Sequence, residues 1–336
     1  MSYQQRTCLP TTVEVLVGRD EVLSNLRVAL TRTLAGVGDC LVLEGPAGIG
    51  KSKLLESVAA EADLLGLSVA TGQAVELDRG TPLATLLRAL RSLGSELAPD
   101  ALVDTPASGL RQMDQLRSVL ENHVRDRPLV ILLDDAHLAD ELTALVLRIL
   151  VPALSSLPVL WVLTRRPGPV RGAGQTVLEA IDWLLGAGAR RVPLHPLDDE
   201  AVTALCTNAL GATPDRTVLS LVARCGGNPF LLRELLTALR ETGQLQVDGD
   251  RATVVRTGLP SDFLSTVHRR LSDLSDQVRR LLDAGAVLGR PFTLHEGAGL
   301  LGCRAVDLVP AATDAVASGV LEDRENELEF RHELFR

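Results

Sequence analysis

The sequence of 336 residues predicts an α/β fold with a parallel sheet, followed by a region that consists almost entirely of helices. Two observations predict it. Short, continuous apolar runs alternate with helical patterns over residues 1–195, as expected of strands covered on both faces. From residue 198 onward the apolar periodicity is helical until a short alternating ribbon near the end. Hydrophobic residues make up 46% of the chain and charged residues 23%, which is typical of a folded protein of two or three domains.

In the first part, strands are expected where apolar runs end in glycine, proline or charge. The predicted strands cover residues 41–43, 67–70, 129–133 and 159–163, and helices are expected over 54–62, 83–97, 110–124 and 141–150. The stretch 144–164 is about long enough to span a bilayer. Arg148, Pro152 and Pro158 interrupt it, so a buried helix, a loop and a buried strand explain it better, and no membrane contact is expected.

The second part is expected to contain two domains. Helices are predicted over residues 199–210, 215–224, 230–242, 262–273, 276–288, 294–300 and 305–318, and ribbon strands over 320–322 and 328–330. We therefore expect an α/β domain over 1–195, a helical domain over 196–257 and a winged-helix domain over 258–336. No strand is expected between residues 197 and 320. The end of the chain reads as an uncapped helix start, as in a truncated C-terminus.

Charge and cysteine content restrict the classes of function that are expected. Lys and Arg number 34 against 43 Asp and Glu, a net charge of -9, which is the wrong sign for a chain that neutralises phosphates along a duplex. Bulk DNA binding is therefore not expected. The five cysteines form no pattern with metal-ligand spacing and residues 1–10 contain no secretory signal, so we expect reduced thiols in a cytoplasmic protein.

A glycine-rich segment between the first predicted strand and the next helix matches the pattern G-x-x-x-x-G-K-[S/T], the P-loop of nucleoside triphosphatases. Its glycines let backbone N–H groups surround a phosphate at a helix N-terminus. Lys51 would reach the β- and γ-phosphate oxygens, and the Ser52 hydroxyl would ligate Mg²⁺. The candidate nucleotide-binding residues here are Gly45, Pro46, Ala47, Gly48, Ile49, Gly50, Lys51, Ser52 and Lys53.

The strand over 129–133 ends in two carboxylates, as the Mg²⁺-holding strand of a P-loop site does. Asp134 is expected to hold Mg²⁺, mostly through water, and Asp135 to polarise the attacking water as a general base. The alternative is that these residues cap a helix. For His137 and Asp140, which follow, capping or surface positions are at least as compatible as an active-site position.

Two further segments carry candidate residues. Arg165 follows the strand over 159–163, at the sheet edge where ligands of α/β proteins bind, and would either sense the γ-phosphate or lie solvated. The segment 17–21 precedes the first long helix, and taken alone it predicts a helix cap. The run 198–200 is expected to be a solvated helix start.

Together, these segments resemble the signal-transduction ATPases with numerous domains (STAND), an AAA+-like branch of the P-loop proteins, and in particular the large ATP-binding regulators of the LuxR type. The markers occur in the order found in that family. They are Val-Gly-Arg-Asp-Glu at 17–21, the P-loop, Leu-Asp-Asp-Ala-His at 133–137, Thr-Arg-Arg-Pro at 164–167, Gly-Asn-Pro-Phe-Leu at 227–231 and Phe-Arg-His-Glu-Leu at 330–334.

The resemblance implies an ATP- or ADP-binding switch with slow hydrolysis that regulates transcription, whose nucleotide lies between the α/β domain, a helical lid and the winged helix. By position, Gly18 and Arg19 would lie near the adenine, Pro229 would pack against base or ribose, and His332 would bond the β-phosphate of ADP. ATP would open the protein and allow self-association. Such proteins continue into helical sensor repeats and a C-terminal DNA-binding domain.

Three other functions fit parts of the pattern. One is a P-loop enzyme such as a small-molecule kinase or a transport ATPase, which turnover would distinguish, since kinases work at about 1–100 s⁻¹. Another is an origin-binding-like AAA+ ATPase whose winged helix binds DNA. The third is a nucleotide-dependent scaffold without hydrolysis.

Overall fold

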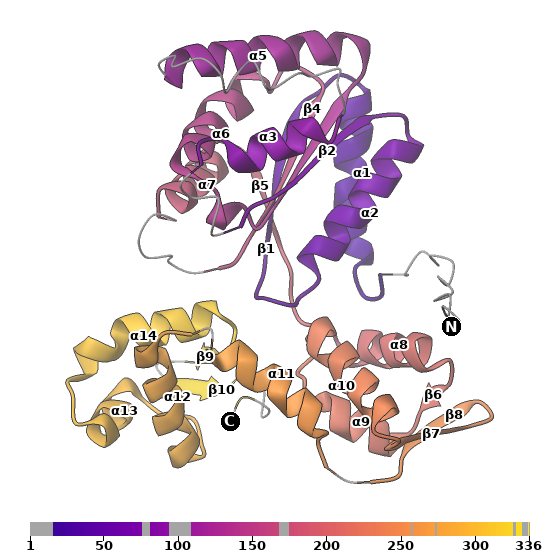
Figure 1. Ribbon diagram of the computed structural model, residues 1–336, viewed down its shortest axis with the longest axis vertical. Coiled ribbons are helices and arrows are strands. Elements are labelled where there is room, and N and C mark those ends of the chain that lie inside the picture. Colours follow the sequence, from indigo (N-terminus) through magenta and orange to yellow (C-terminus); the bar gives the residue numbers. More distant parts are fainter. Residues whose placement is uncertain are drawn as a thin grey trace, which may run out of the picture.

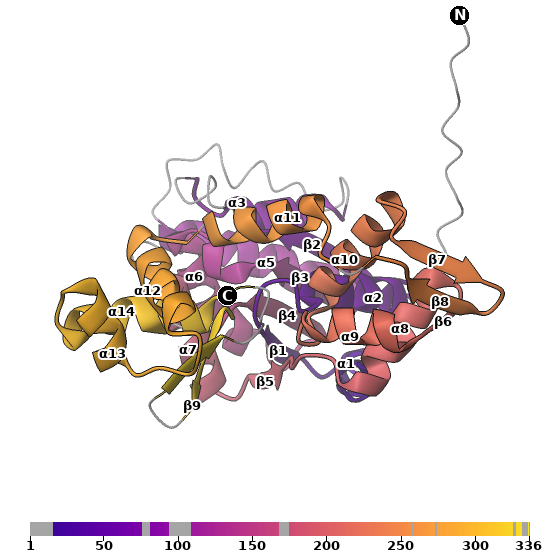
Figure 2. The same ribbon diagram turned by 90° about the horizontal axis from the view of Figure 1, so that it is seen from below.

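The structure is a computed structural model that describes residues 16–75, 81–93, 109–167, 175–256, 258–272, 274–324, 327–330 and 335. An α/β part contains the sheet, and two groups of helices lie beyond its lower end in Figure 1. The chain passes from the last strand of the sheet into the first of these groups (Figure 1). A helix, α11, extends from this group toward the second one in both views (Figures 1 and 2).

The sheet has five parallel strands in the order β2-β3-β4-β1-β5. The strands are β1 (Asp39–Glu44), β2 (Ser68–Gln73), β3 (Leu129–Asp134), β4 (Val159–Arg165) and β5 (Arg190–Pro193). Because β4 lies between β1 and β3, the segments that follow these three strands emerge side by side at one edge. The polar residues after each strand therefore meet there.

Helices cover both faces of the sheet, as the continuous apolar runs predict. In β3, Val130 and Leu132 belong to the core beneath one face, whereas Leu129, Ile131 and Leu133 belong to the core beneath the other. One face is covered by α1 (Asp20–Leu34) and α2 (Lys51–Leu64), and the other by α3 (Ala84–Arg91), α5 (Gly109–Asp126), α6 (Glu141–Ala153) and α7 (Gln175–Gly186).

The predicted strands and most predicted helices of this part are confirmed. The apolar stretch 144–164 is α6, a short connection and β4, and within the described ranges no helix is long and apolar enough to cross a membrane. The helix predicted over 83–97 extends only to Arg91, and its last four positions lie outside the described residues. The sequence analysis missed α7 and β5, the latter because it is short and carries two arginines.

The lid segment, residues 196–256, contains α8 (Asp199–Leu210), α9 (Arg216–Ala223) and α10 (Pro229–Glu241). The prediction of an all-helical segment is wrong, because β6 (Thr213–Pro214), β7 (Leu245–Asp248) and β8 (Arg251–Val254) form a three-stranded sheet. The hairpin strands are four residues long and Ala252 is their one buried residue, so they lack the apolar alternation by which strands are found. The two-residue Gly249-Asp250 turn between them, with Gly249 at φ 60°, was the available signal.

The C-terminal segment contains α11 (Ser261–Ser272), α12 (Asp276–Leu288), α13 (Leu294–Leu301), α14 (Ala305–Ala317), β9 (Leu321–Arg324) and β10 (Glu327–Phe330). The predicted helices and the antiparallel ribbon are confirmed, and Phe292 adds a bridge to Leu328. One cluster of buried residues extends from Leu197 to Phe335, so the lid segment and the C-terminal segment share a hydrophobic core. The winged-helix designation stays a prediction.

Of the five cysteines in the sequence, Cys40, Cys206 and Cys225 are buried and Cys303 is exposed, whereas Cys8 lies outside the described residues.

Candidate nucleotide-binding site

The glycine-rich segment joins β1 to the N-terminus of α2, as the sequence predicts. Gly48 and Gly50 have φ angles of 77° and 103°, a backbone region that side chains rarely tolerate. Gly45 is required for a different reason, since a Cβ there would lie 2.9 Å from the Ile49 side chain. With α2 beginning at Lys51, the loop precedes the positive end of a helix, which favours an anion.

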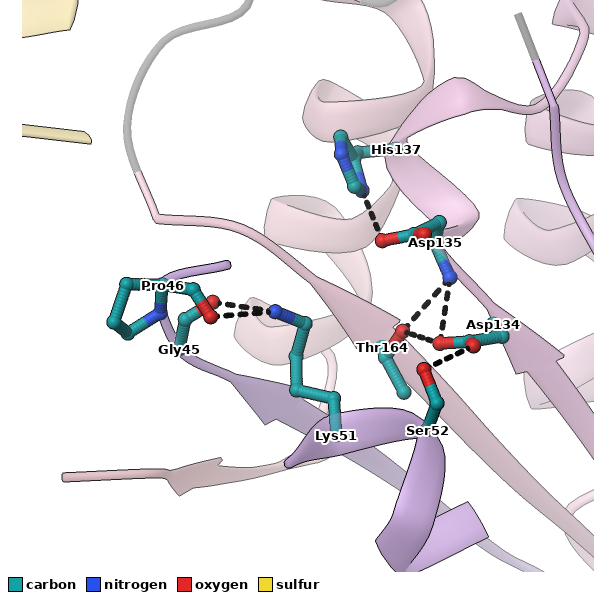
Figure 3. A network of polar contacts seen from close by, with 8 residues as sticks. All are labelled: Gly45, Pro46, Lys51, Ser52, Asp134, Asp135, His137 and Thr164. Carbon is teal, nitrogen blue, oxygen red and sulfur yellow. Dashed lines mark hydrogen bonds and ion pairs between the residues drawn. The ribbon is translucent and has the colours of Figure 1, made fainter. Parts of the chain in front are cut away.

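All five carbonyl groups from residue 45 to residue 49 accept hydrogen bonds. Lys51 Nζ donates to the carbonyls of Gly45 at 2.7 Å and Pro46 at 2.9 Å (Figure 3). The next three donors come from elsewhere in the chain. They are Asn228 Nδ2 to the Ala47 carbonyl at 3.1 Å, the Phe230 N–H to the Gly48 carbonyl at 3.2 Å, and Arg19 Nη2 to the Ile49 carbonyl at 3.0 Å.

Beside the loop, Asp134 at the end of β3 joins two hydroxyl groups. Ser52 Oγ donates to Asp134 Oδ2, and Thr164 Oγ1 donates to Asp134 Oδ1, both at 2.6 Å (Figure 3). The three side chains come from α2, β3 and β4. Carboxylate and hydroxyl oxygens are the protein ligands that Mg²⁺ prefers when it also binds phosphates. Ser52 and Asp134, the two residues predicted to hold the metal, therefore fit Mg²⁺.

Asp135 is held in an unusual backbone conformation at the same edge. Its φ is 48°, which for a non-glycine residue costs on the order of 1–3 kcal/mol and is typical of functional sites. The Asp135 N–H donates to Thr164 Oγ1 at 2.8 Å. Burial, together with the neighbouring Asp134 carboxylate, raises the pKa of the Asp135 carboxyl above its ordinary value. A raised pKa suits a general base, because it brings the proton affinity nearer to the working pH.

His137 and Asp140, which the sequence left undecided, have separate positions. His137 is buried, with Nδ1 3.9 Å from Asp135 Oδ1 (Figure 3). Asp140 caps α6 by accepting from the Thr143 N–H, and it also accepts from the Leu83 N–H at 2.9 Å. Asp140 therefore has the capping role, and His137 lies beside the candidate base.

Arg165 is buried and ion-paired, so the solvated alternative is wrong. Its guanidinium donates to Glu44, the residue before the P-loop, at 2.8 Å and to Asp182 of α7 at 2.6 Å. Burial alone would lower the pKa of Arg165, but the hydrogen bonds and charges of Asp182 and Glu44 outweigh it and raise the pKa above its ordinary value. Thr164 is the residue of β4 that contacts Asp134. Thr164 was not among the predicted site residues, and the signal for it was a hydroxyl at the end of a buried strand.

Gly18 and Arg19 lie between the P-loop and the lid segment. Arg19 is at the N-cap position of α1, within the segment predicted to be a helix cap, but its side chain makes no capping hydrogen bond. Its Nη1 donates to the carbonyl of His195 at 2.7 Å, while Nη2 bonds the Ile49 carbonyl. Burial lowers the pKa of Arg19. Gly18 packs closely on α8, where a Cβ would lie 2.5 Å from that of Ala201.

The lid segment reaches the P-loop through the first turn of α10. Asn228 is 3% exposed and caps this helix by accepting from the Phe230 and Leu231 N–H groups. Pro229 follows as the first helical residue. Pro229 was a predicted site residue and Asn228 was not, because an Asn before a helix predicts a cap and no sequence pattern indicates a contact to a residue 181 positions away.

Of the remaining candidates, Lys53 pairs with Glu56 at 2.7 Å on an exposed turn of α2. Asp198, in the run predicted to be solvated, caps α8. His332 lies outside the described residues, so its predicted contact with a phosphate stays a prediction.

The comparison with known families agrees with this geometry. Residues 15–162 match the family model of the AAA ATPase domain. This part of the chain is therefore similar to AAA ATPase domains. The match covers both the P-loop and the Asp134-Asp135 pair, and the five-stranded parallel sheet has the P-loop fold of AAA+ structures.

Solved structures share the fold over nearly the whole chain. A Walker-type ATPase of Pyrococcus abyssi aligns with a TM-score of 0.61 at 15% identity, covering 95% of each chain. The Orc1 protein of Aeropyrum pernix, in a structure with DNA, aligns with a TM-score of 0.54 at 19% identity, covering 97% of this chain and 92% of that one.

A curated relative, an uncharacterized protein of Rhizobium meliloti, is 26% identical over 83% of this chain. The chain spans 30% of the length of that relative.

Proposed function

We propose that the chain binds ATP and ADP with Mg²⁺ and hydrolyses ATP slowly as a nucleotide-dependent switch. The observation that carries this proposal is the Ser52–Asp134–Thr164 network beside a P-loop on an AAA ATPase fold. Mg²⁺, when bound, would neutralise charge that develops on the phosphates. Lys51 would turn from the loop carbonyls to the phosphates, and Asp135 would accept a proton from the attacking water.

Three parts of the chain meet at the P-loop, and this supports the switch. The N-terminal segment contributes Arg19, and the lid segment contributes Asn228 and the Phe230 N–H. We propose that Pro229 packs on the base or ribose, that Arg165 responds to the γ-phosphate, and that His332 contacts ADP in a closed form. A ligand that binds one arrangement of these parts more tightly shifts the population toward it.

The regulatory role is the finer part of the proposal. The resemblance to LuxR-type regulators supports it, as does a relative more than three times the length of the aligned part. We propose that this segment controls sensor repeats and a DNA-binding domain elsewhere in a longer protein, and that ATP promotes self-association.

Isothermal calorimetry with Mg-ATP and Mg-ADP tests the nucleotide site. Lys51→Ala should remove most binding, because the phosphate charge loses its ammonium partner in a fixed cradle. Arg27→Ala is the matched control, since Arg27 pairs with Glu61 on the exposed side of the same helical layer. Undiminished affinity in Lys51→Ala would reject the site.

A further inference from the structure

The hydrogen bonds accepted by the P-loop carbonyls fix the directions of the P-loop N–H groups. A peptide unit is planar and trans, so the carbonyl of one residue and the N–H of the next point in opposite directions. The carbonyls of Ala47, Gly48 and Ile49 therefore set the directions of the N–H groups of residues 48, 49 and 50. These are the N–H groups that a P-loop presents to phosphate.

The three donors that hold these carbonyls all lie outside the P-loop. Lys51 bonds the two earlier carbonyls, those of Gly45 and Pro46, and it would leave them to reach a phosphate. The external donors then remain to orient the loop. Two of the three, Asn228 Nδ2 and the Phe230 N–H, belong to the first turn of α10, so displacement of the lid segment would break these two bonds to the Ala47 and Gly48 carbonyls together.

We propose that Asn228 is a positioning residue that orients the phosphate-binding N–H groups and links their geometry to docking of the lid segment. The two polar atoms of its side-chain amide make different contacts. Oδ1 caps α10, whereas Nδ2 reaches Ala47 at 3.1 Å. The side chain is 3% exposed, so water does not readily replace this donor. The inference rests on the proposed nucleotide binding.

Substitution separates the two contacts. Serine is as good an N-cap as asparagine but lacks the amide donor, so Asn228→Ser should keep the cap and lose the P-loop contact. Asn228→Ala should lose both. Asp215→Ala is the control, because Asp215 caps α9 in the lid segment by accepting from the Thr217 and Val218 N–H groups, and no bond joins it to the P-loop.

The nucleotide-free chain provides the first readout. Labelling alanine carbonyls with ¹³C and glycine amides with ¹⁵N selects Ala-Gly steps, of which the sequence has six, including Ala47-Gly48. Asn228→Ser should move the Ala47-Gly48 signal while the other five and the melting midpoint stay near wild type. Asp215→Ala should lower the midpoint without moving that signal. An unmoved signal in Asn228→Ser would overturn the inference, whether or not the chain binds nucleotide.

Affinity provides the second readout. Loss of one hydrogen bond should weaken Mg-ATP binding in Asn228→Ser roughly three- to tenfold. Equal affinity of wild type and Asn228→Ser, with Lys51→Ala inactive in binding, would overturn the positioning role but leave the nucleotide site intact. Full wild-type affinity in Asn228→Ser together with weakened affinity in Asn228→Ala would assign Asn228 to the cap alone.

Discussion

Replacing Thr164 by valine removes one hydroxyl from the centre of the site and changes its shape little. Thr164 is fully buried, donates to Asp134 at 2.6 Å and accepts from the Asp135 N–H at 2.8 Å. The Asp135 N–H retains Asp134 Oδ1 at 3.0 Å, so valine leaves no orphaned backbone donor. The main loss is a hydrogen bond to a carboxylate, which contributes about 1.5–3 kcal/mol. We expect the free energy of unfolding of the α/β part to fall by about that amount.

Urea denaturation followed by tryptophan fluorescence measures this change, because the two tryptophans, Trp161 and Trp183, both lie in the α/β part. Thr33→Val is the matched control. Thr33 is equally buried, but its hydroxyl donates to the neutral Ala29 carbonyl, so we expect a loss of only about 0.5–1 kcal/mol. ATP turnover should fall in Thr164→Val alone. Equal stability losses, with turnover unchanged in both variants, would refute the assignment of Thr164 to the site.

The remaining predictions concern hydrolysis, nucleotide preference and DNA. Asp135→Asn should keep nucleotide affinity but lower turnover by about 10²–10⁴-fold, the usual contribution of a general base. Lost Mg²⁺ binding in this variant would reverse the roles of Asp134 and Asp135. Arg165→Met should lower the free energy of unfolding by about 1–3 kcal/mol, because Glu44 loses Arg165 and keeps Arg191 at 3.9 Å. It should also weaken ATP more than ADP in calorimetry, and equal weakening would confine Arg165 to its ion pairs. His332→Ala should weaken ADP relative to ATP, and an unchanged ratio would contradict its predicted role. Electrophoretic shifts should detect no nanomolar, salt-sensitive DNA binding, given the net charge of -9.

The buried elements of the fold were the predictable ones. The continuous apolar run of β3 and the helical period of α12 follow directly from burial, because a buried surface requires apolar side chains at fixed intervals. The hairpin of β7 and β8 escaped prediction, since Ala252 is the one buried residue in its two strands and a single buried position defines no period. β5 escaped because four residues with alternating burial are too few to define a period.

In the site, the local motif, and not burial, decided which residues could be predicted. The P-loop and Asp134 were predictable because their chemistry demands particular residue types within a few positions of one another. The partners of Arg165 were not, because Glu44 and Asp182 are joined to it only by the parallel register of the sheet and the docking of α7. The sequence shows that Arg165 is present, but the fold determines which carboxylates pair with it.

Contacts to backbone carbonyls are hidden from the sequence on the acceptor side, because every residue offers the same group. Ala47 and Ile49 would accept from Asn228 and Arg19 whatever their own side chains were. Only the donor carries information, and Asn228 is already explained as a helix cap, so its second bond adds no new pattern. A coupling between lid and phosphate cradle built in this way can be recognised only once the chain is folded. The requirement for a side-chain donor then becomes testable at a single position.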